Sequence, residues 1–165
     1  MDAARWAPSA GNTQPWHFIV ITEANIKQKI ADVCTRYSRK HWEKFPPEIA
    51  HYLSARGGSW DKSTIVKIPV LIAVCYELPK GMHHELILGS IWAAIENMLL
   101  AATAEGLGSC IYTFYNKEEK DQIKRILHVP KKYGIAAIIQ LGYAATHPPP
   151  PIRKPLKEIV HQQYF

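Results

Sequence analysis

The segment from Leu86 to Ala104 limits the folds that this chain can adopt, because it is apolar on nearly every face of a helix. Such a helix must be buried on most sides or lie in a membrane, and its length approaches the membrane-spanning range. Glu96 and Asn97 fall in its middle, and strands alternate with helices around it. Both features favour a buried helix in a soluble domain. A domain of 165 residues offers little cover for it, so we expect a homodimer interface to supply the rest.

Four short runs rich in apolar and β-branched residues predict the strands that pack on this helix. They comprise residues 17–22, 69–76, 110–114 and 135–143. The second run is apolar throughout, which indicates a central strand covered on both faces. The sequence contains no internal repeat, so we expect residues 1–165 to form a single domain.

Polar and glycine residues mark the expected ends of the helices. Residues 1–7 resemble the last turns of a helix. Thr22 is expected to N-cap a helix that continues to about residue 40, and Asn116 is expected to N-cap the helix that follows it. Gly106 is expected just beyond the end of the apolar helix, where a left-handed residue is common.

A rigid polar loop runs from Pro8 to Trp16. Pro8 and Pro15 restrict the backbone on either side, and Gly11 and Asn12 tolerate the positive φ of a tight turn. Hydroxyl and amide groups come from Ser9, Asn12, Thr13 and Gln14. The loop suits a planar, hydrogen-bonding ligand. It equally suits a surface turn whose polar side chains bond their own backbone.

Two further segments have a less regular pattern. Residues 41–66 are broken by Pro46-Pro47 and by Gly57-Gly58, and they are expected to be either a lid over a pocket or an ordinary variable insertion. Residues 147–165 begin with four prolines, which predict an extended polyproline tail. A tail of this kind is suited to embracing a partner subunit.

The formal charge of +6 and the pI near 9.2 suit an anionic ligand, such as a phosphate-bearing cofactor. They would also suit nucleic acid, but the basic residues form no long run and no recognisable binding module. We therefore expect no nucleic-acid partner and no membrane partner.

The cysteines and histidines indicate neither disulfides nor a metal site. Three isolated cysteines lie among apolar neighbours, which predicts buried, reduced thiols in a cytoplasmic protein: Cys34, Cys75 and Cys110. His83, His84 and Glu85 are adjacent, so they would point to different sides of a helix instead of converging on a metal. We expect no secretory signal at the start of the chain, because Asp2 and Arg5 interrupt any apolar stretch.

Three segments occur together in a characteristic order and spacing. The first is the loop Pro8–Trp16 with the strand after it, and the second runs from Ala94 to Cys110. The third is Gly142-Tyr143 with Arg153-Lys154-Pro155 beyond it. Together they resemble the nitroreductase family of flavin enzymes over nearly the whole chain apart from residues 41–66. The resemblance does not extend to the Arg-Arg-Ser-Ile-Arg-like motif that members usually carry ahead of the loop.

The resemblance implies an α+β fold, in which a mainly antiparallel sheet is flanked by helices, in an intertwined homodimer with one FMN at each of two subunit interfaces. It implies flavin contacts, some from the opposite subunit, from Pro8, Ser9, Ala10, Asn12 and Gln14. It implies that the ring or the ribityl chain is lined by Leu107, Gly108, Tyr112 and Thr113. The phosphate would be bound by Arg153, whose guanidinium matches phosphate oxygens, and by Lys154.

The function implied by the resemblance is FMN-dependent transfer of hydride from NADH or NADPH to a nitroaromatic, quinone or similar acceptor by a ping-pong mechanism. The flavin N5 would carry the chemistry, so no catalytic side chain is expected. Tyr52 and Trp60 would set the choice of acceptor. Two alternatives remain open: a flavin-binding or flavin-storing protein without turnover, and a flavin-cleaving or dehalogenating enzyme on the same scaffold.

Overall fold

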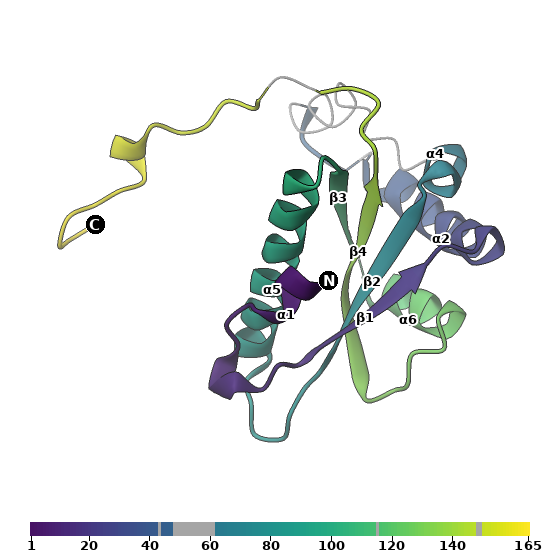
Figure 1. The fold of residues 1–165 in the computed structure, drawn as a ribbon, viewed down its shortest axis with the longest axis horizontal. Helices are drawn as coiled ribbons and strands as arrows, with labels where there is room; N and C mark the ends of the chain where they lie inside the picture. Colours follow the sequence, from purple (N-terminus) through teal and green to yellow (C-terminus); the bar gives the residue numbers. More distant parts are fainter. Residues whose placement is uncertain (43, 48–61, 115, 148–149) are drawn as a thin grey trace.

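The computed structural model describes residues 1–42, 44–47, 62–114, 116–147 and 150–165. In these residues a four-stranded antiparallel sheet lies between two layers of helices (Figure 1). The strands are β1 (Trp16–Ile21), β2 (Val70–Glu77), β3 (Gly108–Thr113) and β4 (Tyr133–Gly142). The helices are α1 (Asp2–Arg5), α2 (Ala24–Trp42), α4 (Lys62–Lys67), α5 (His84–Ala104) and α6 (Lys117–Ile126), with short 3₁₀ turns η1 (Ala10–Asn12) and η2 (Leu156–Glu158). The expected α+β fold with a flanked antiparallel sheet is confirmed.

The sheet has the order β1-β2-β4-β3, so β2 and β4 are interior strands and β1 and β3 are edges. Residues 71–76 of β2 are all buried. This confirms the central strand that the uninterrupted apolar run predicted, since helices cover it on both faces.

One extra residue in β4 interrupts its pairing with β2. Val74 pairs with Ala137 and Cys75 pairs with Ile135, so Ala136 is left without a partner of its own. Ala136 and Ala137 both belong to the core cluster beneath α5, because a bulge of this kind disturbs the strict alternation of faces along a strand.

Helix α5 packs one face on the sheet and leaves the other outward. Its buried residues include Ile87, Ile91, Ala94, Ile95 and Met98. On the outward face, Leu86 is 52% exposed, Trp92 37% and Leu100 61%. A single copy of the chain therefore leaves this outward face of α5 uncovered. The homodimer interface expected to cover it stays a prediction. The helix is also long and apolar enough to span a membrane, but its packing on the sheet is that of a core helix.

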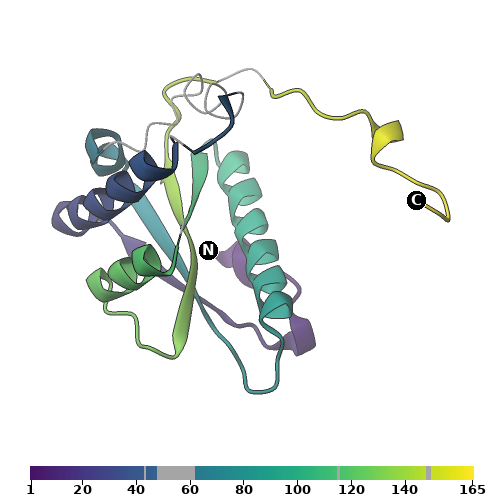
Figure 2. The same ribbon diagram turned by 180° about the vertical axis from the view of Figure 1, so that it is seen from behind.

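Helices α2, α4 and α6 cover the opposite face of the sheet (Figure 2). Each contributes a fully buried isoleucine: Ile30, Ile65 and Ile123. These side chains belong to one core cluster with Ile135 and Ile138 of β4. The two core clusters, one on each side of the sheet, are the structural basis of the three layers.

Of the two predicted N-cap residues, Asn116 is confirmed and Thr22 is not. Asn116 caps α6, because its Oδ1 accepts a hydrogen bond of 2.9 Å from the backbone N–H of Glu119. Thr22 does not cap α2. The helix begins at Ala24, and its first backbone hydrogen bond runs from Lys27 to the carbonyl of Glu23. Glu23 therefore occupies the N-cap position, one residue later than expected.

The end of α5 is fixed by a glycine, as predicted. Gly106 has φ +74°, and its N–H donates to the Thr103 carbonyl at 3.0 Å. The Leu107 N–H donates to the Ala102 carbonyl at 2.8 Å. This pair of bonds is the Schellman motif, which turns the chain sharply out of the helix and into β3.

The two less regular segments differ in how much the structure describes. Residues 43 and 48–61 of the first segment, on which the expected lid or insertion mainly falls, lie outside the described residues. Helix α4 overlaps the end of the segment and continues to Lys67, where no helix was predicted. The tail extends away from the rest of the chain (Figures 1 and 2), and residues 152–165 are all exposed. Within the tail, Leu156–Glu158 form the short 3₁₀ turn η2.

A buried lysine joins α2 to the start of β2. Lys27 is 7% exposed, and its Nζ donates to the carbonyl of Ile68 at 2.7 Å and to that of Pro69 at 3.4 Å. The Ile68 carbonyl follows the last turn of α4, where a positive charge also complements the helix dipole.

We predict that Lys27→Met lowers the free energy of unfolding by about 1–3 kcal/mol, because it leaves the Ile68 carbonyl without its donor. Urea denaturation measures the change. Lys29→Met, at an exposed position on the same helix, is the matched control and should change stability by no more than about 0.5 kcal/mol. Equal stability of the two variants would contradict the role given to Lys27.

Candidate functional site

The loop between α1 and β1 has an unusual backbone. Gly11, Asn12 and Gln14 have φ values of +57°, +53° and +46°. Positive φ at Gly11 and Asn12 agrees with the prediction, whereas Gln14 was not expected to adopt it. Non-glycine residues in this region are strained, and such strain collects at binding sites when the surroundings hold it in place.

Hydrogen bonds hold the loop in this shape. The Ser9 Oγ accepts from the Gln14 N–H at 3.0 Å, and the Thr13 Oγ1 donates to the Ala10 carbonyl at 2.9 Å. Ser90 of α5 connects the loop to the core, because its Oγ accepts from the Ala10 N–H at 3.0 Å. The loop is therefore a preformed set of backbone and amide groups attached to the first half of α5.

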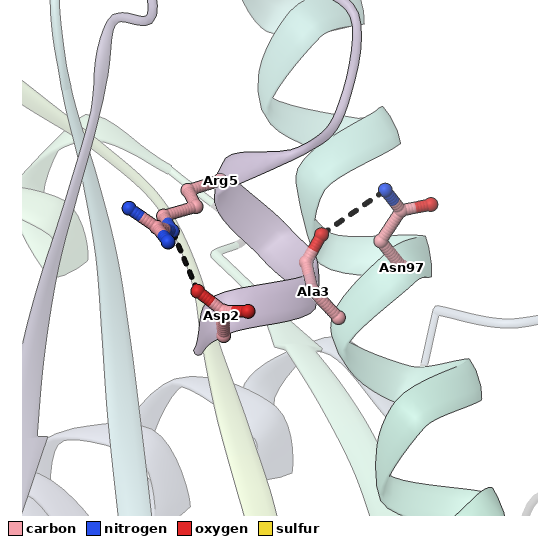
Figure 3. A network of polar contacts seen from close by, with 4 residues as sticks. All are labelled: Asp2, Ala3, Arg5 and Asn97. Carbon is pink, nitrogen blue, oxygen red and sulfur yellow. Dashed lines mark hydrogen bonds and ion pairs between the residues drawn. The ribbon is translucent and has the colours of Figure 1, made fainter.

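Helix α1 is fixed to α5 beside this loop (Figure 3). The Asn97 side chain donates to the Ala3 carbonyl at 3.2 Å, while Arg5 points away from α5 and pairs with Asp2. Arg5, Trp6 and Ala7 then form one wall of a pocket of about 280 Å³. Asn12 and Gln14 form the other wall. Two of the five predicted loop contacts thus lie at a concave surface.

The second group of predicted contacts lies beyond the end of α5. Leu107 and Gly108 are half-buried at the start of β3, and Thr113 is exposed at its end. A Cβ on Gly108 would lie 3.1 Å from the Ala144 Cβ, so a larger residue would press on the chain after β4. Leu107 and Gly108 therefore bring the turn after α5 close to the beginning of the tail.

Tyr112 points to the opposite side of the sheet from α5. It is 2% exposed, and its hydroxyl donates to the buried carboxylate of Glu119. The Cys34 carbonyl lies 3.5 Å from the same hydroxyl oxygen. Burial in this cluster raises the pKa of Tyr112. It also raises the pKa of Cys34, with a further contribution from Glu119. The Tyr112 side chain therefore does not face α5 and the loop, and only its backbone is available to a flavin there.

Within a single chain the loop lies far from Leu107 and Gly108. Ser90, which bonds Ala10, lies about 21 Å along α5 from the last residue of the helix, Ala104, and Leu107 follows the turn beyond it. Strands β1 and β3 are opposite edges of the sheet, about 14 Å apart across three strand spacings. The loop contacts and the pair Leu107–Gly108 thus lie apart in one chain, and Thr113 lies at the other end of β3.

The remaining predicted residues lie elsewhere. Arg153 and Lys154 are exposed in the tail, and within the described part of the chain neither forms an ion pair. Both cations are thus available to an anionic group such as a phosphate. Tyr52 and Trp60, expected to choose the acceptor, lie outside the described residues.

The described cysteines and acidic residues give no indication of a metal site. Cys34 and Cys75 are buried, as predicted, and burial raises the pKa of Cys75 to about 11. Cys110 is exposed, which corrects the expectation that all three thiols are buried. Among the described residues, His, Cys, Asp and Glu form no group that could hold a metal ion.

Two residues in these arrangements were missed in the sequence. Ser90 is one of the few polar residues in a mostly apolar helix, and that contrast is visible in the sequence. Glu119 follows its N-cap residue by three positions, where a glutamate usually belongs to an exposed capping box. Its complete burial depends on the fit of α6 against β3, which the sequence does not show.

The donor set of the loop and tail fits FMN. Amide and backbone groups of both polarities, held rigidly, complement the polar edge of an isoalloxazine ring, and unpaired cations complement a phosphate. The outward face of α5 adds an exposed apolar surface.

Comparison with known proteins agrees with this fit. A statistical model of the nitroreductase family matches residues 1–143. The chain is 27% identical over 143 residues to an iodotyrosine deiodinase of Thermotoga neapolitana, which covers 87% of this chain and 73% of that protein. It is 25% identical over 157 residues to an oxygen-insensitive NADPH nitroreductase of Helicobacter pylori, with 86% and 72% covered. A crystal structure of iodotyrosine deiodinase bound to FMN and 3-iodo-L-tyrosine matches with a TM-score of 0.82 and 27% identity, over 99% of this chain and 84% of that one.

We predict that Ser90→Ala loosens the loop, because the Ala10 N–H loses its acceptor. Amide hydrogen exchange should become faster at Ala10 and Gln14. Thr103→Ala is the matched control, since Ser90 and Thr103 both donate to the carbonyl four residues earlier, but Thr103 lies at the far end of α5 from the loop. Equal exchange rates in the two variants would show that Ser90 does not hold the loop.

Proposed function

The chain belongs to the nitroreductase family, and we propose that it is an FMN-dependent oxidoreductase that transfers electrons from NADH or NADPH to an aromatic acceptor. The observation that carries this proposal is the match of almost the entire chain to a structure that holds FMN, at a TM-score of 0.82. The name of the Helicobacter pylori relative supports NADPH as reductant and a nitro compound as acceptor. A cytoplasmic location belongs to the same proposal.

The FMN-binding residues are the two groups described above together with the tail. The loop residues Ser9, Asn12 and Gln14 would bond the ring edge. Thr113 would contribute its hydroxyl, and Arg153 would bind the phosphate together with Lys154. When bound, FMN supplies the two-electron redox chemistry. The side chains position the ring, exclude water and neutralise negative charge.

A homodimer would unite the two groups. If two α5 helices pack antiparallel about a two-fold axis, the first half of one helix meets the last half of the other. The loop of one copy, fixed at Ser90, would then approach Leu107 and Gly108 of the second copy. The outward apolar residues of α5, Trp92 and Leu100 among them, supply the surface that such packing buries.

Two acceptors fit the proposal, and their net reactions balance. A nitroaromatic compound would be reduced by ArNO₂ + NAD(P)H + H⁺ → ArNO + NAD(P)⁺ + H₂O, in which the nicotinamide loses two electrons and the nitro group gains them. The similarity to iodotyrosine deiodinases favours a second candidate, reductive loss of iodide by ArI + NAD(P)H → ArH + NAD(P)⁺ + I⁻. Neither reaction requires a side chain as nucleophile.

Titration of the purified chain with FMN, followed by anaerobic addition of NADH or NADPH, tests the function. We predict flavin uptake and bleaching of the flavin absorbance, followed by recolouring with nitrobenzene, a quinone or 3-iodo-L-tyrosine, whichever is the acceptor. Uptake without bleaching would favour flavin storage, and no uptake would contradict the proposal.

Arg153→Ala should weaken FMN binding by about 1.5–3 kcal/mol, or roughly tenfold to a hundredfold in Kd. Arg125→Ala on α6 is the control and should leave the Kd unchanged.

The dimer makes a separate prediction. Leu100→Glu puts a charge on the outward face of α5 and should give a monomer in sedimentation velocity, with loss of FMN binding, because each site needs both copies. Ala24→Glu adds the same charge at an exposed position on α2, in the opposite helix layer, and should remain a dimer. Tight FMN binding by a stable monomer would contradict the shared site.

A further inference from the structure

The pocket between α1 and the loop joins two proposed flavin contacts, Asn12 and Gln14, to three residues that the flavin contacts do not use, Arg5, Trp6 and Ala7. Its five lining residues, Arg5, Trp6, Ala7, Asn12 and Gln14, combine a cation, an indole and two amides. Its volume is about 280 Å³. A cavity of about 150 Å³ holds a benzene molecule, so this pocket has room for one substituted aromatic ring.

Arg5 is only loosely engaged by its neighbour. Its Nε donates to the Asp2 Oδ1 at 2.6 Å, and both side chains are mostly exposed, at 64% and 75%. A guanidinium carries five N–H donors, so this bond leaves the two terminal nitrogens for another acceptor. An exposed ion pair contributes at most about 1 kcal/mol, so an anionic ligand could draw Arg5 toward the pocket at small cost.

Trp6 offers an aromatic surface in the same place. Its side chain is 74% exposed, which is unusual for an indole, and the Arg5 Cζ lies 5.6 Å from its ring centroid. A flat ring can stack on the indole while the guanidinium bonds a substituent on that ring.

The amides complete the polar side of the pocket. The Gln14 Nε2 donates to the Asn12 Oδ1 at 3.3 Å, which uses one of the two N–H groups of Gln14 and leaves the NH₂ group of Asn12. Both residues have a left-handed backbone in a hydrogen-bonded loop, so the backbone that carries the two amides is in place before a ligand arrives.

We propose that this pocket is a subsite for the acceptor, and that it selects a single aromatic ring carrying a carboxylate. The ring stacks on Trp6 and the carboxylate bonds the terminal nitrogens of Arg5, beside the Asn12 and Gln14 amides that the flavin would contact. The subsite rests on the proposed function for its role as an acceptor site, because the loop that forms one wall also carries the expected flavin contacts.

Equilibrium binding of 4-nitrobenzoate and nitrobenzene, measured calorimetrically with the FMN-loaded and the FMN-free chain, tests the subsite without turnover. The two probes differ only in the carboxylate. We expect wild-type protein to bind 4-nitrobenzoate more tightly than nitrobenzene. Arg5→Gln should lower the affinity for 4-nitrobenzoate about tenfold, which is the scale of one hydrogen bond to a charged group. It should leave the affinity for nitrobenzene unchanged.

Three further variants separate the contributions. Trp6→Ala should weaken both probes, and Trp6→Phe should restore most of the loss. Asp2→Asn should tighten 4-nitrobenzoate by up to about fivefold, because Arg5 no longer has a competing carboxylate. Arg125→Gln on α6 changes the net charge as Arg5→Gln does and should have no effect.

Several results would overturn the subsite. Equal affinity of Arg5→Gln and wild type for 4-nitrobenzoate would exclude the carboxylate contact. Loss of FMN affinity in Arg5→Gln would assign Arg5 to the cofactor, and conversion of Trp6→Ala to a monomer would assign Trp6 to the subunit interface. Failure of the wild-type chain to take up FMN would contradict the proposed function separately, since probe binding is measured with and without the cofactor.

Discussion

The fold depends on the burial of α5 against the centre of the sheet. Ile87, Ile91 and Ile95 lie in contact with the interior strands, and this contact forms one of the two cores. The same helix also holds the candidate site in place, because two polar side chains in its mostly apolar sequence bond the segment that precedes β1. Asn97 holds α1 and Ser90 holds the loop. The helix that forms one of the two cores therefore also sets the positions of the ligand-binding groups.

Most of the secondary structure could be predicted because its signals are local. The four apolar runs became the four described strands, and Asn116 and Gly106 marked helix ends through bonds to residues only three or four positions away. The prediction that Thr22 is the N-cap of α2 was wrong. Thr22 and Glu23 both precede the helix, and the path of the incoming chain decides which of them occupies the N-cap position. The prediction that Cys110 is buried was wrong, because apolar neighbours in the sequence do not show that a residue lies on an edge strand.

The candidate site was harder to predict, for reasons of geometry. Both faces of the sheet are covered, so alternation along β3 could not indicate that Tyr112 points toward Glu119 and away from α5. The family resemblance supplied a set of contact residues but not the separation between Ala10 and Leu107. The pocket beside Arg5 and Trp6 arises from the packing of α1, which no periodic pattern in seven residues could reveal.

The bulge in β4 affects how this chain is compared with others. On one side of Ala136 the residues of β4 pair with β2 in one register, and on the other side they pair one position out of step. A relative without the bulge would have one residue fewer in this strand, although its core side chains occupied the same positions. A correct alignment would then place a gap inside a buried strand, where alignments normally penalise gaps most. Aligning β4 without that gap would misassign every residue on one side of Ala136 to the wrong face of the sheet.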